Sequence, residues 1–346
     1  MDDKITKDPK QRRDFMKKMV LGTAASLMPV YGLQAWNEMK ESMGEKSFVP
    51  VMLTPYNKDK SVDYKGLESL TDHYLAAGAR GLFANCLSSE MYDLSPEERL
   101  KVTETVVRRV NGRFPVVATG SFGDTASKKA TFSKKLADTG VDAVILITSH
   151  FAAPEDSDET MIRNLEAYLN QTHSLALGTY ECPSPYKRVL SLEVLDFLLG
   201  TGRLIYHKDT TEDIEHIRKK LRLSDGSDLG LYNAHIGSAV ASLRTGGAGL
   251  SPIAGNYYPE VIAWVCQHAE DPDKKAEVDW LQDKLTDMES RITANYQLSS
   301  RYYLNKSGLN LELTSRRANA SLTREEQEQI DQAHREVQEW KERLGV

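Results

Sequence analysis

A repeat of short apolar runs, each followed by a longer helical pattern, extends from residue 48 to residue 268 and constrains the fold more than any other feature. The apolar runs are expected to be β-strands, at residues 48–53, 81–84, 115–119, 143–147, 176–180, 204–207, 229–232 and 249–251. The helices are expected at residues 63–77, 125–139, 158–172, 191–199, 211–221, 236–244 and 259–268, with one more beginning at Ser95. Because parallel strands require crossover helices, eight such units predict a closed (β/α)8 TIM barrel. A doubly wound open sheet is the alternative.

Beyond residue 270 the sequence becomes helical throughout, which predicts a C-terminal helical appendage at residues 271–346, packed on a barrel domain at residues 48–270. Thr323 and Glu326 form a capping box like that of Ser95 and Glu98 in the barrel. Apolar residues then recur at helical spacing: Ile330, Ala333, Val337, Trp340 and Leu344. This stripe is expected to be core or subunit contact rather than part of a site.

The first 47 residues differ from the rest and predict a leader and linker. Arg12-Arg13 is followed by Phe15 and Lys17, and a weakly apolar run occupies residues 19–33. This order is typical of a twin-arginine export signal, and the run is too short for an ordinary spanning helix. We therefore expect an exported protein, periplasmic or anchored to the membrane by this leader. A basic tail on a cytoplasmic enzyme is the alternative.

Charge and cysteine content limit the partners. The net charge of −6 argues against nucleic acid, whose binding rests on dense Lys/Arg contacts to phosphate. Cys86, Cys182 and Cys266 lack the spacing of a zinc site, and their odd number favours free thiols, although one bridge stays possible. His150 and His235 stand on separate predicted loops without a metal-binding motif. The sequence therefore predicts no metal and no cofactor.

Lys208 follows the apolar run at residues 204–207, and in a TIM barrel the residues at the carboxyl ends of strands form the active site. Burial disfavours the charged form of a lysine, and the neutral amine can attack the carbonyl of a 2-oxo acid to form a Schiff base. Tyr180 ends the preceding strand and is the candidate proton shuttle. The candidate substrate-binding residues come from other strand ends: Leu87, Ser88, Ser89, Phe151, Asn233 and Ser251.

Several short motifs, in this order, carry a resemblance to a known family: Thr54-Pro55-Tyr56, Ser61-Val62-Asp63, Gly78-Ala79-Arg80-Gly81, Leu94-Ser95-Pro96-Glu97-Glu98-Arg99, Gly112-Arg113-Phe114-Pro115, Gly140-Val141-Asp142-Ala143, Tyr180 with Pro183, Lys208-Asp209, and Gly246-Gly247-Ala248-Gly249-Leu250-Ser251. Residues 48–259 thereby resemble the dihydrodipicolinate synthase/N-acetylneuraminate lyase family, class I pyruvate-type aldolases on a TIM barrel. The resemblance implies that Lys208 is the Schiff-base lysine and Tyr180 its proton relay.

This chain departs from the family pattern at four places. The Gly-[Ser/Thr]-Thr-Gly-Glu loop that holds the keto acid falls on residues 86–90, where Ser88 and Glu90 fit but Leu87 lacks a hydroxyl. Pro185 stands where the synthases have an arginine, and Phe151 where they have a tyrosine that crosses a subunit interface. The acidic sugar-binding loop of the sialate lyases falls on residues 233–236, which contain no acid. The lysine-biosynthetic and sialate-cleaving reactions are therefore both poor matches.

The sequence predicts a diverged lyase or aldolase that joins Lys208 to pyruvate or a related 2-oxo acid. The second substrate would be an aldehyde or sugar-derived acid, and the resemblance implies a homo-oligomer, a dimer or tetramer. A non-catalytic barrel that senses a sugar acid or 2-oxo acid is the main alternative. A metal-dependent sugar-acid aldolase or epimerase is a further alternative, to be settled by metal analysis.

Overall fold

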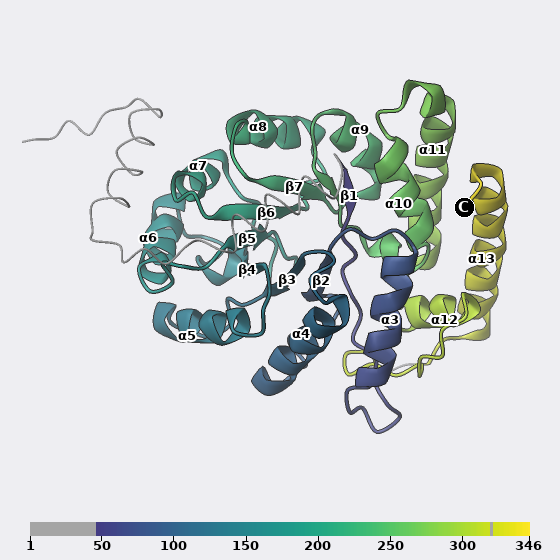
Figure 1. Cartoon of the computed structure of the whole chain (residues 1–346), viewed down its shortest axis with the longest axis horizontal. Coiled ribbons are helices and arrows are strands. Elements are labelled where there is room, and N and C mark those ends of the chain that lie inside the picture. Colours follow the sequence, from purple (N-terminus) through teal and green to yellow (C-terminus); the bar gives the residue numbers. More distant parts are fainter. Residues whose placement is uncertain (1–45, 319–320) are drawn as a thin grey trace, which may run out of the picture.

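The computed structural model describes residues 46–318 and 321–346 (Figure 1). The predicted export leader lies outside the described residues, apart from the last residues of its linker. Among the helices in the described ranges, none combines the length and apolar character needed to cross a bilayer.

Eight parallel strands form one sheet in the order β1-β8-β7-β6-β5-β4-β3-β2. Their bounds are β1 Ser47–Phe48, β2 Leu82–Asn85, β3 Val116–Thr119, β4 Ala143–Ile147, β5 Leu177–Tyr180, β6 Leu204–Asp209, β7 Gly230–Asn233 and β8 Gly249–Leu250. A parallel bridge between Val51 and Phe83 joins the two ends of this order, so the sheet closes into the (β/α)8 barrel that the sequence predicts. The open-sheet alternative is not the fold.

Two strands have an end that differs by more than one residue from the predicted one. The first was expected at residues 48–53, but β1 ends at Phe48 because Pro50 has no N–H to donate to a neighbouring strand. β6 runs two residues further than expected, to Asp209. Lys208 is therefore a strand residue, paired in register with Tyr180 on β5 and with Tyr232 on β7.

The helices follow the strands as expected. Their bounds are α3 Tyr64–Ala76, α4 Pro96–Val110, α5 Ala126–Ala137, α6 Asp158–Leu169, α7 Leu192–Gly200, α8 Ile214–Ser224, α9 Ala239–Arg244 and α10 Pro259–His268. The capping box at Ser95 is confirmed. Helix α8 begins three residues later than predicted, because Asp213 caps it by accepting a hydrogen bond from the Glu215 N–H.

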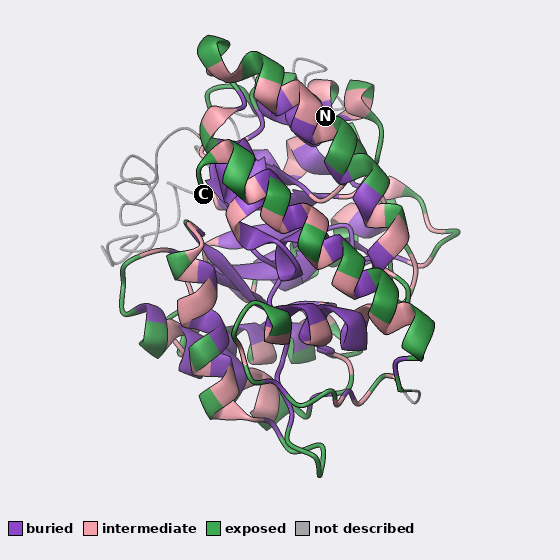
Figure 2. Ribbon diagram, turned by 90° about the vertical axis from the view of Figure 1, so that its right-hand side faces the viewer, coloured by how far each residue is buried: buried purple, intermediate pink, exposed green. Residues whose placement is uncertain are grey.

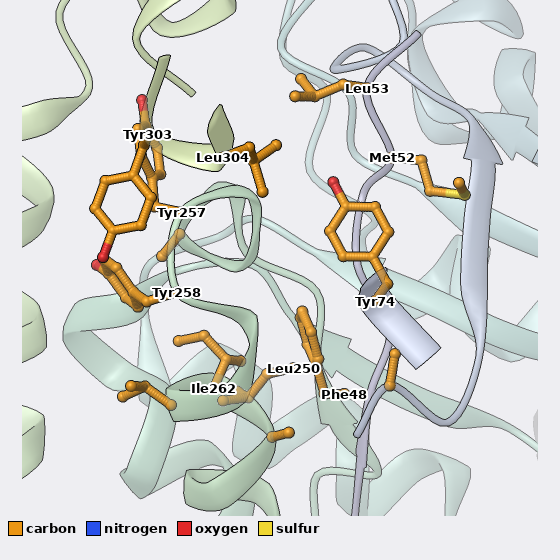
Figure 3. Packing of buried hydrophobic residues seen from close by; sticks show 14 of the residues in the cluster. Phe48, Met52, Leu53, Tyr74, Leu250, Tyr257, Tyr258, Ile262, Tyr303 and Leu304 are labelled. Carbon is orange, nitrogen blue, oxygen red and sulfur yellow. The ribbon is translucent and has the colours of Figure 1, made fainter. Parts of the chain in front are cut away.

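Three C-terminal helices pack beside α10: α11 Lys275–Ile292, α12 Tyr296–Lys306 and α13 Arg324–Leu344 (Figure 1). The capping box at Thr323 is confirmed, and the predicted apolar stripe of α13 is core, with Trp340 in edge contact with Tyr258. Figure 3 shows Tyr303 and Leu304 of α12 against Tyr257 and Tyr258. The appendage and the barrel therefore share one hydrophobic cluster.

Burial separates the strands from the outer helices (Figure 2). The strands are buried throughout, whereas most of the helices expose one face; α10 and α12 are buried along most of their length. Polar side chains inside the barrel are consequently the informative ones, because buried polar groups require partners or a function.

Candidate active site

A cavity of about 920 Å3 opens at the carboxyl ends of the strands, where a TIM barrel carries its chemistry. Strand-end residues form part of its wall: Leu87, Ser88, Tyr180, Lys208, His235 and Ile253. The C-terminal region forms another part, with Glu289, Asn295, Tyr296, Gln297 and Arg317. The appendage therefore contributes directly to the site.

Lys208 lies on this wall with its side chain almost fully buried, at 3% exposure. No hydrogen bond or ion pair from the described residues reaches its Nζ, which packs over the Tyr180 ring, 4.5 Å from the ring centroid. Burial lowers the pKa of Lys208 to about 8. About a tenth of this amine is therefore uncharged at pH 7, in the form that nucleophilic attack requires.

Tyr180 pairs with Lys208 across the sheet, and its ring is held edge-on by Phe83. Burial raises the pKa of Tyr180 well above its ordinary value. The phenol consequently stays protonated over the accessible pH range and can donate a proton to an oxygen formed beside the amine.

The loop after β2 presents Leu87 and Ser88 to the cavity but turns Ser89 away from it. The Ser89 hydroxyl lies 2.7 Å from the Met52 carbonyl oxygen and 2.9 Å from that of Ala84. It also accepts a hydrogen bond from the Cys86 N–H. Ser89 thus fixes the loop's conformation rather than lining the cavity.

Three other predicted substrate-binding residues lie outside this cavity. Phe151 lines a separate cavity of about 400 Å3 beside Lys129. The Asn233 amide donates to the Ser238 hydroxyl, and the Ser251 hydroxyl donates to the Val49 carbonyl. Of the six predicted substrate-binding residues, the structure brings only Leu87 and Ser88 together with Lys208 and Tyr180.

The sequence interpretation missed the residues that the C-terminal region contributes. The Tyr296 hydroxyl donates to Ser88 Oγ over 2.9 Å, and the Gln297 amide donates to the Ser88 carbonyl oxygen over 3.2 Å. Arg317 lines the cavity, and no described carboxylate pairs with its side chain. Tyr296 lies 208 residues after Ser88, so no local pattern indicates this contact.

Glu90 connects the loop after β2 to the C-terminal region that lines the cavity. Its carboxylate, fully buried after Ser89, pairs with the buried Arg301 guanidinium of α12 at 2.9 Å. It also accepts hydrogen bonds from the Ser315 hydroxyl and from the N–H groups of Arg316 and Arg317. Paired in this way, the buried charge ties the loop after β2 to the segment that carries Arg317.

Behind the cavity wall, Glu181, His207 and Asp209 offer three ligand atoms within 4.8 Å of one another, a spacing that a metal ion could use. The Lys220 ammonium of α8 lies among them, in contact with Glu181 Oε1, 2.7 Å from Asp209 Oδ2 and 3.2 Å from His207 Nε2. Burial opposes ionisation of Asp209, but His207 and Lys220 outweigh it and hold its pKa below the ordinary value. Lys220 therefore balances the negative charge of the Glu181 and Asp209 carboxylates, as a metal ion bound there would.

The three cysteines, Cys86, Cys182 and Cys266, are buried free thiols, as predicted.

Glu289 lies on the cavity wall, and burial, with a smaller contribution from Glu212, raises its pKa to about 7. The cavity therefore holds a second group that can exchange protons near neutrality.

A model of the dihydrodipicolinate synthetase family matches residues 45–337. The chain belongs to this family. A 4-hydroxy-tetrahydrodipicolinate synthase from Shewanella denitrificans is 30% identical over 224 residues, which are 65% of this chain and 75% of that protein.

Two solved structures show the same fold. Dihydrodipicolinate synthase from Bacteroides thetaiotaomicron matches with a TM-score of 0.75 at 22% identity, over 85% of this chain and 99% of that chain. YagE of E. coli K12, a prophage protein of the dihydrodipicolinic acid synthase family solved in complex with pyruvate, matches with a TM-score of 0.73 at 20% identity, over 86% and 98%.

Two residues that depart from the family pattern, Leu87 and Phe151, lie in different places. Leu87 faces the cavity where the family motif has a hydroxyl, and Phe151 lies outside it. A hydroxyl that contacts the loop after β2 comes from Tyr296 of the same chain.

Proposed function

We propose that the protein is a Schiff-base-forming lyase or aldolase that acts on pyruvate or a related 2-oxo acid. The observation that carries the proposal is the Lys208 amine, which is buried on the cavity wall, lacks an ion-pair partner among the described residues and has a pKa of about 8. Membership in the dihydrodipicolinate synthetase family supports the aldolase/lyase class. The complex of YagE with pyruvate supports the choice of 2-oxo acid.

The neutral Lys208 amine attacks the C2 carbonyl of the oxo acid, and the resulting carbinolamine loses water to give an iminium ion. Tyr180 donates the proton that lets the hydroxyl leave as water, and it is reprotonated by the water or substrate that follows. The iminium then accepts the electron pair released when the bond from C3 to the second substrate breaks. In the opposite direction, loss of a C3 proton gives the enamine that attacks an aldehyde.

The second substrate would occupy the outer part of the cavity, between the loops after the strands and the C-terminal region. Arg317 offers a guanidinium without a described partner carboxylate, whereas Lys187 is already paired with Glu212 at 3.1 Å. An aldehyde or sugar-derived acid with a carboxylate fits this arrangement, because guanidinium and carboxylate groups form strong paired hydrogen bonds.

Borohydride trapping with pyruvate, followed by peptide mapping, tests the proposal. The expected result is a reduced adduct on Lys208 that is absent from Lys208→Ala. Lys129→Ala is the matched control, because Lys129 is another buried lysine with a pKa lowered by burial, but it lines the separate cavity with Phe151. The proposal fails if no 2-oxo acid of a panel gives an adduct on Lys208.

A sensor of sugar acids or 2-oxo acids is the second candidate, favoured by the apolar Leu87 on the cavity wall where the family motif has a hydroxyl. A ligand thermal-shift screen separates the two functions, because a sensor binds equally well after Lys208→Ala. We further propose an exported protein that forms a homo-oligomer. Cell fractionation and light scattering test these two points.

A further inference from the structure

Four side chains form a hydrogen-bonded chain from the buried face of helix α3 to the cavity. The Tyr74 hydroxyl of α3 donates to Asn256 Oδ1, and Asn256 Nδ2 donates to the Tyr296 oxygen. Tyr296 in turn donates to Ser88 Oγ over 2.9 Å. Tyr74 and Asn256 are fully buried, and Tyr296 and Ser88 line the cavity that contains Lys208.

The direction of donation in this chain is fixed from its buried end. The Tyr74 hydroxyl donates to the Oδ1 end of the Asn256 amide. Figure 3 shows Tyr74 and Leu53 in this part of the core. The Val51 carbonyl oxygen, which can only accept, lies 2.8 Å from the other end of the Asn256 amide and identifies that atom as the nitrogen.

This direction determines where the Ser88 hydrogen lies. The Tyr296 oxygen already accepts from Asn256, and its single hydrogen goes to Ser88 Oγ. Ser88 Oγ therefore acts as an acceptor toward Tyr296, and its own hydrogen remains free for a group in the cavity. The Gln297 amide holds the Ser88 carbonyl on the same side, so two neighbouring residues of α12 orient one serine.

We propose that Tyr296 is a positioning residue that turns the Ser88 hydroxyl hydrogen toward the carboxylate of a 2-oxo acid bound at Lys208. This inference rests on the proposed function. It assigns to the C-terminal helix α12 a part in substrate binding within the same chain, at the place where Leu87 offers no hydroxyl. Loss of a hydrogen bond to a charged group weakens binding by about tenfold or more, and so the loss of this orientation is measurable.

The test measures the pyruvate concentration that gives half-maximal borohydride-trapped adduct. Tyr296→Phe is expected to raise it about tenfold, as expected for the loss of a hydrogen bond to a charged group. Tyr303→Phe is the matched control, because Tyr303 lies on the same helix and its hydroxyl has no hydrogen-bond partner among the described residues. It is expected to leave the pyruvate concentration unchanged.

A double-mutant cycle separates orientation of Ser88 from a general structural effect. Ser88→Ala is expected to weaken pyruvate binding about as much as Tyr296→Phe, and the double variant no more than Ser88→Ala alone. Ser88→Thr keeps a hydroxyl at this position and is expected to restore most of the pyruvate binding that Ser88→Ala loses. If Tyr296→Phe does not fold, the two Ser88 variants still test the inference. An unchanged pyruvate requirement in Ser88→Ala overturns it. A higher pyruvate requirement in Ser88→Ala that is absent from Ser88→Thr supports it.

The two ways of failing are distinct. The inference is overturned, and the proposed function stands, if the wild type forms the adduct but Tyr296→Phe is indistinguishable from Tyr303→Phe. The same holds if the effects of Tyr296→Phe and Ser88→Ala on the pyruvate requirement multiply in the double variant. No adduct on Lys208 in the wild type overturns both.

Discussion

Two buried lysines on consecutive elements, Lys208 of β6 and Lys220 of α8, lie in opposite environments. Lys208 is 3% exposed, packs over the Tyr180 ring and has no ion-pair partner in the part of the chain that the structure describes. Lys220 is fully buried and bonds to the carboxylates of Glu181 and Asp209. Glu181 and Asp209 directly follow Tyr180 and Lys208 in the sequence, so the paired and the unpaired lysine lie on either side of the same two strands.

The contrast shows how the fold separates an unpaired buried amine from a paired one. Transfer of a charged group into the protein interior is unfavourable unless a partner compensates it. Lys220 has two such partners and holds β5 and β6 together as an ammonium ion. Lys208 has no such partner, and burial therefore lowers its pKa. The carboxylates of Glu181 and Asp209 therefore pair with Lys220 on the side of the strands away from the cavity, and not with Lys208.

The largest expected effect is on adduct formation. Lys208→Met is expected to abolish the pyruvate adduct, because no other described lysine combines deep burial, the cavity wall and the absence of an ion-pair partner. Lys220→Arg keeps a cation between Glu181 and Asp209 and is expected to retain the adduct on Lys208. Mass spectrometry of borohydride-reduced peptides measures both. An adduct that survives in Lys208→Met would remove the distinction between the two lysines.

Removing the paired amine is expected to give the largest loss of stability. Lys220→Met leaves Glu181 and Asp209 buried without their cation, and breaking a buried ion pair on one side typically costs about 3–5 kcal/mol. Urea unfolding at pH 7.5 measures the loss. A triple variant with Glu181→Gln and Asp209→Asn is the control, because neutral amides remove the unpaired charges and should recover part of the stability. A loss below about 1 kcal/mol would mean that the network is not structural.

Removing the unpaired amine of Lys208 is expected to change the stability in the opposite direction. The pKa of Lys208 falls from 10.5 to about 8 on folding, so the unfolded chain binds more protons between these values and stability rises with pH across that window. Below pH 8 the difference of about 2.5 pKa units corresponds to a penalty of ~3 kcal/mol. Lys208→Met is therefore expected to gain stability at pH 7 and to lose the rise between pH 8 and pH 10. Unfolding curves at several pH values check this, and a destabilised Lys208→Met would contradict it.

The sequence indicates the burial of the unpaired lysine, Lys208, better than that of the paired one, Lys220, for a physical reason. Lys208 follows an apolar run that can only be a buried strand, so its position at the end of the barrel follows from the strand–helix repeat. Lys220 stands among Arg218, Lys219 and Arg222, a run that is typical of a solvated helix face. Its burial depends on where α8 begins and on carboxylates from two strands, which only the assembled barrel brings together.

The same limit applies to the cavity wall. Position after a strand predicts that Leu87 and Ser88 face the site, and both line the cavity, but it cannot tell which strand-end side chains turn back into the barrel. Ser89 and Ser251 do so because backbone carbonyls at the barrel closure need hydrogen-bond donors. Tyr296 enters from α12 through the ion pair between Glu90 and Arg301, a contact between residues 211 positions apart. Local pattern contains no information about such a contact.

The smallest expected effect is the pH dependence of the reaction of Lys208. Because the neutral amine attacks the carbonyl, the rate of adduct formation follows the deprotonated fraction, which rises with pH and levels off above the pKa of about 8. Between pH 6 and pH 8 the deprotonated fraction increases about fiftyfold, and between pH 8 and pH 9 about twofold. Trapping with cyanoborohydride at a saturating pyruvate concentration measures the rate at each pH. A midpoint near 10.5 would place Lys208 in the same class as a solvated lysine, whereas a midpoint near 8 that persists at high salt would show that burial, not a screened surface charge, sets its reactivity.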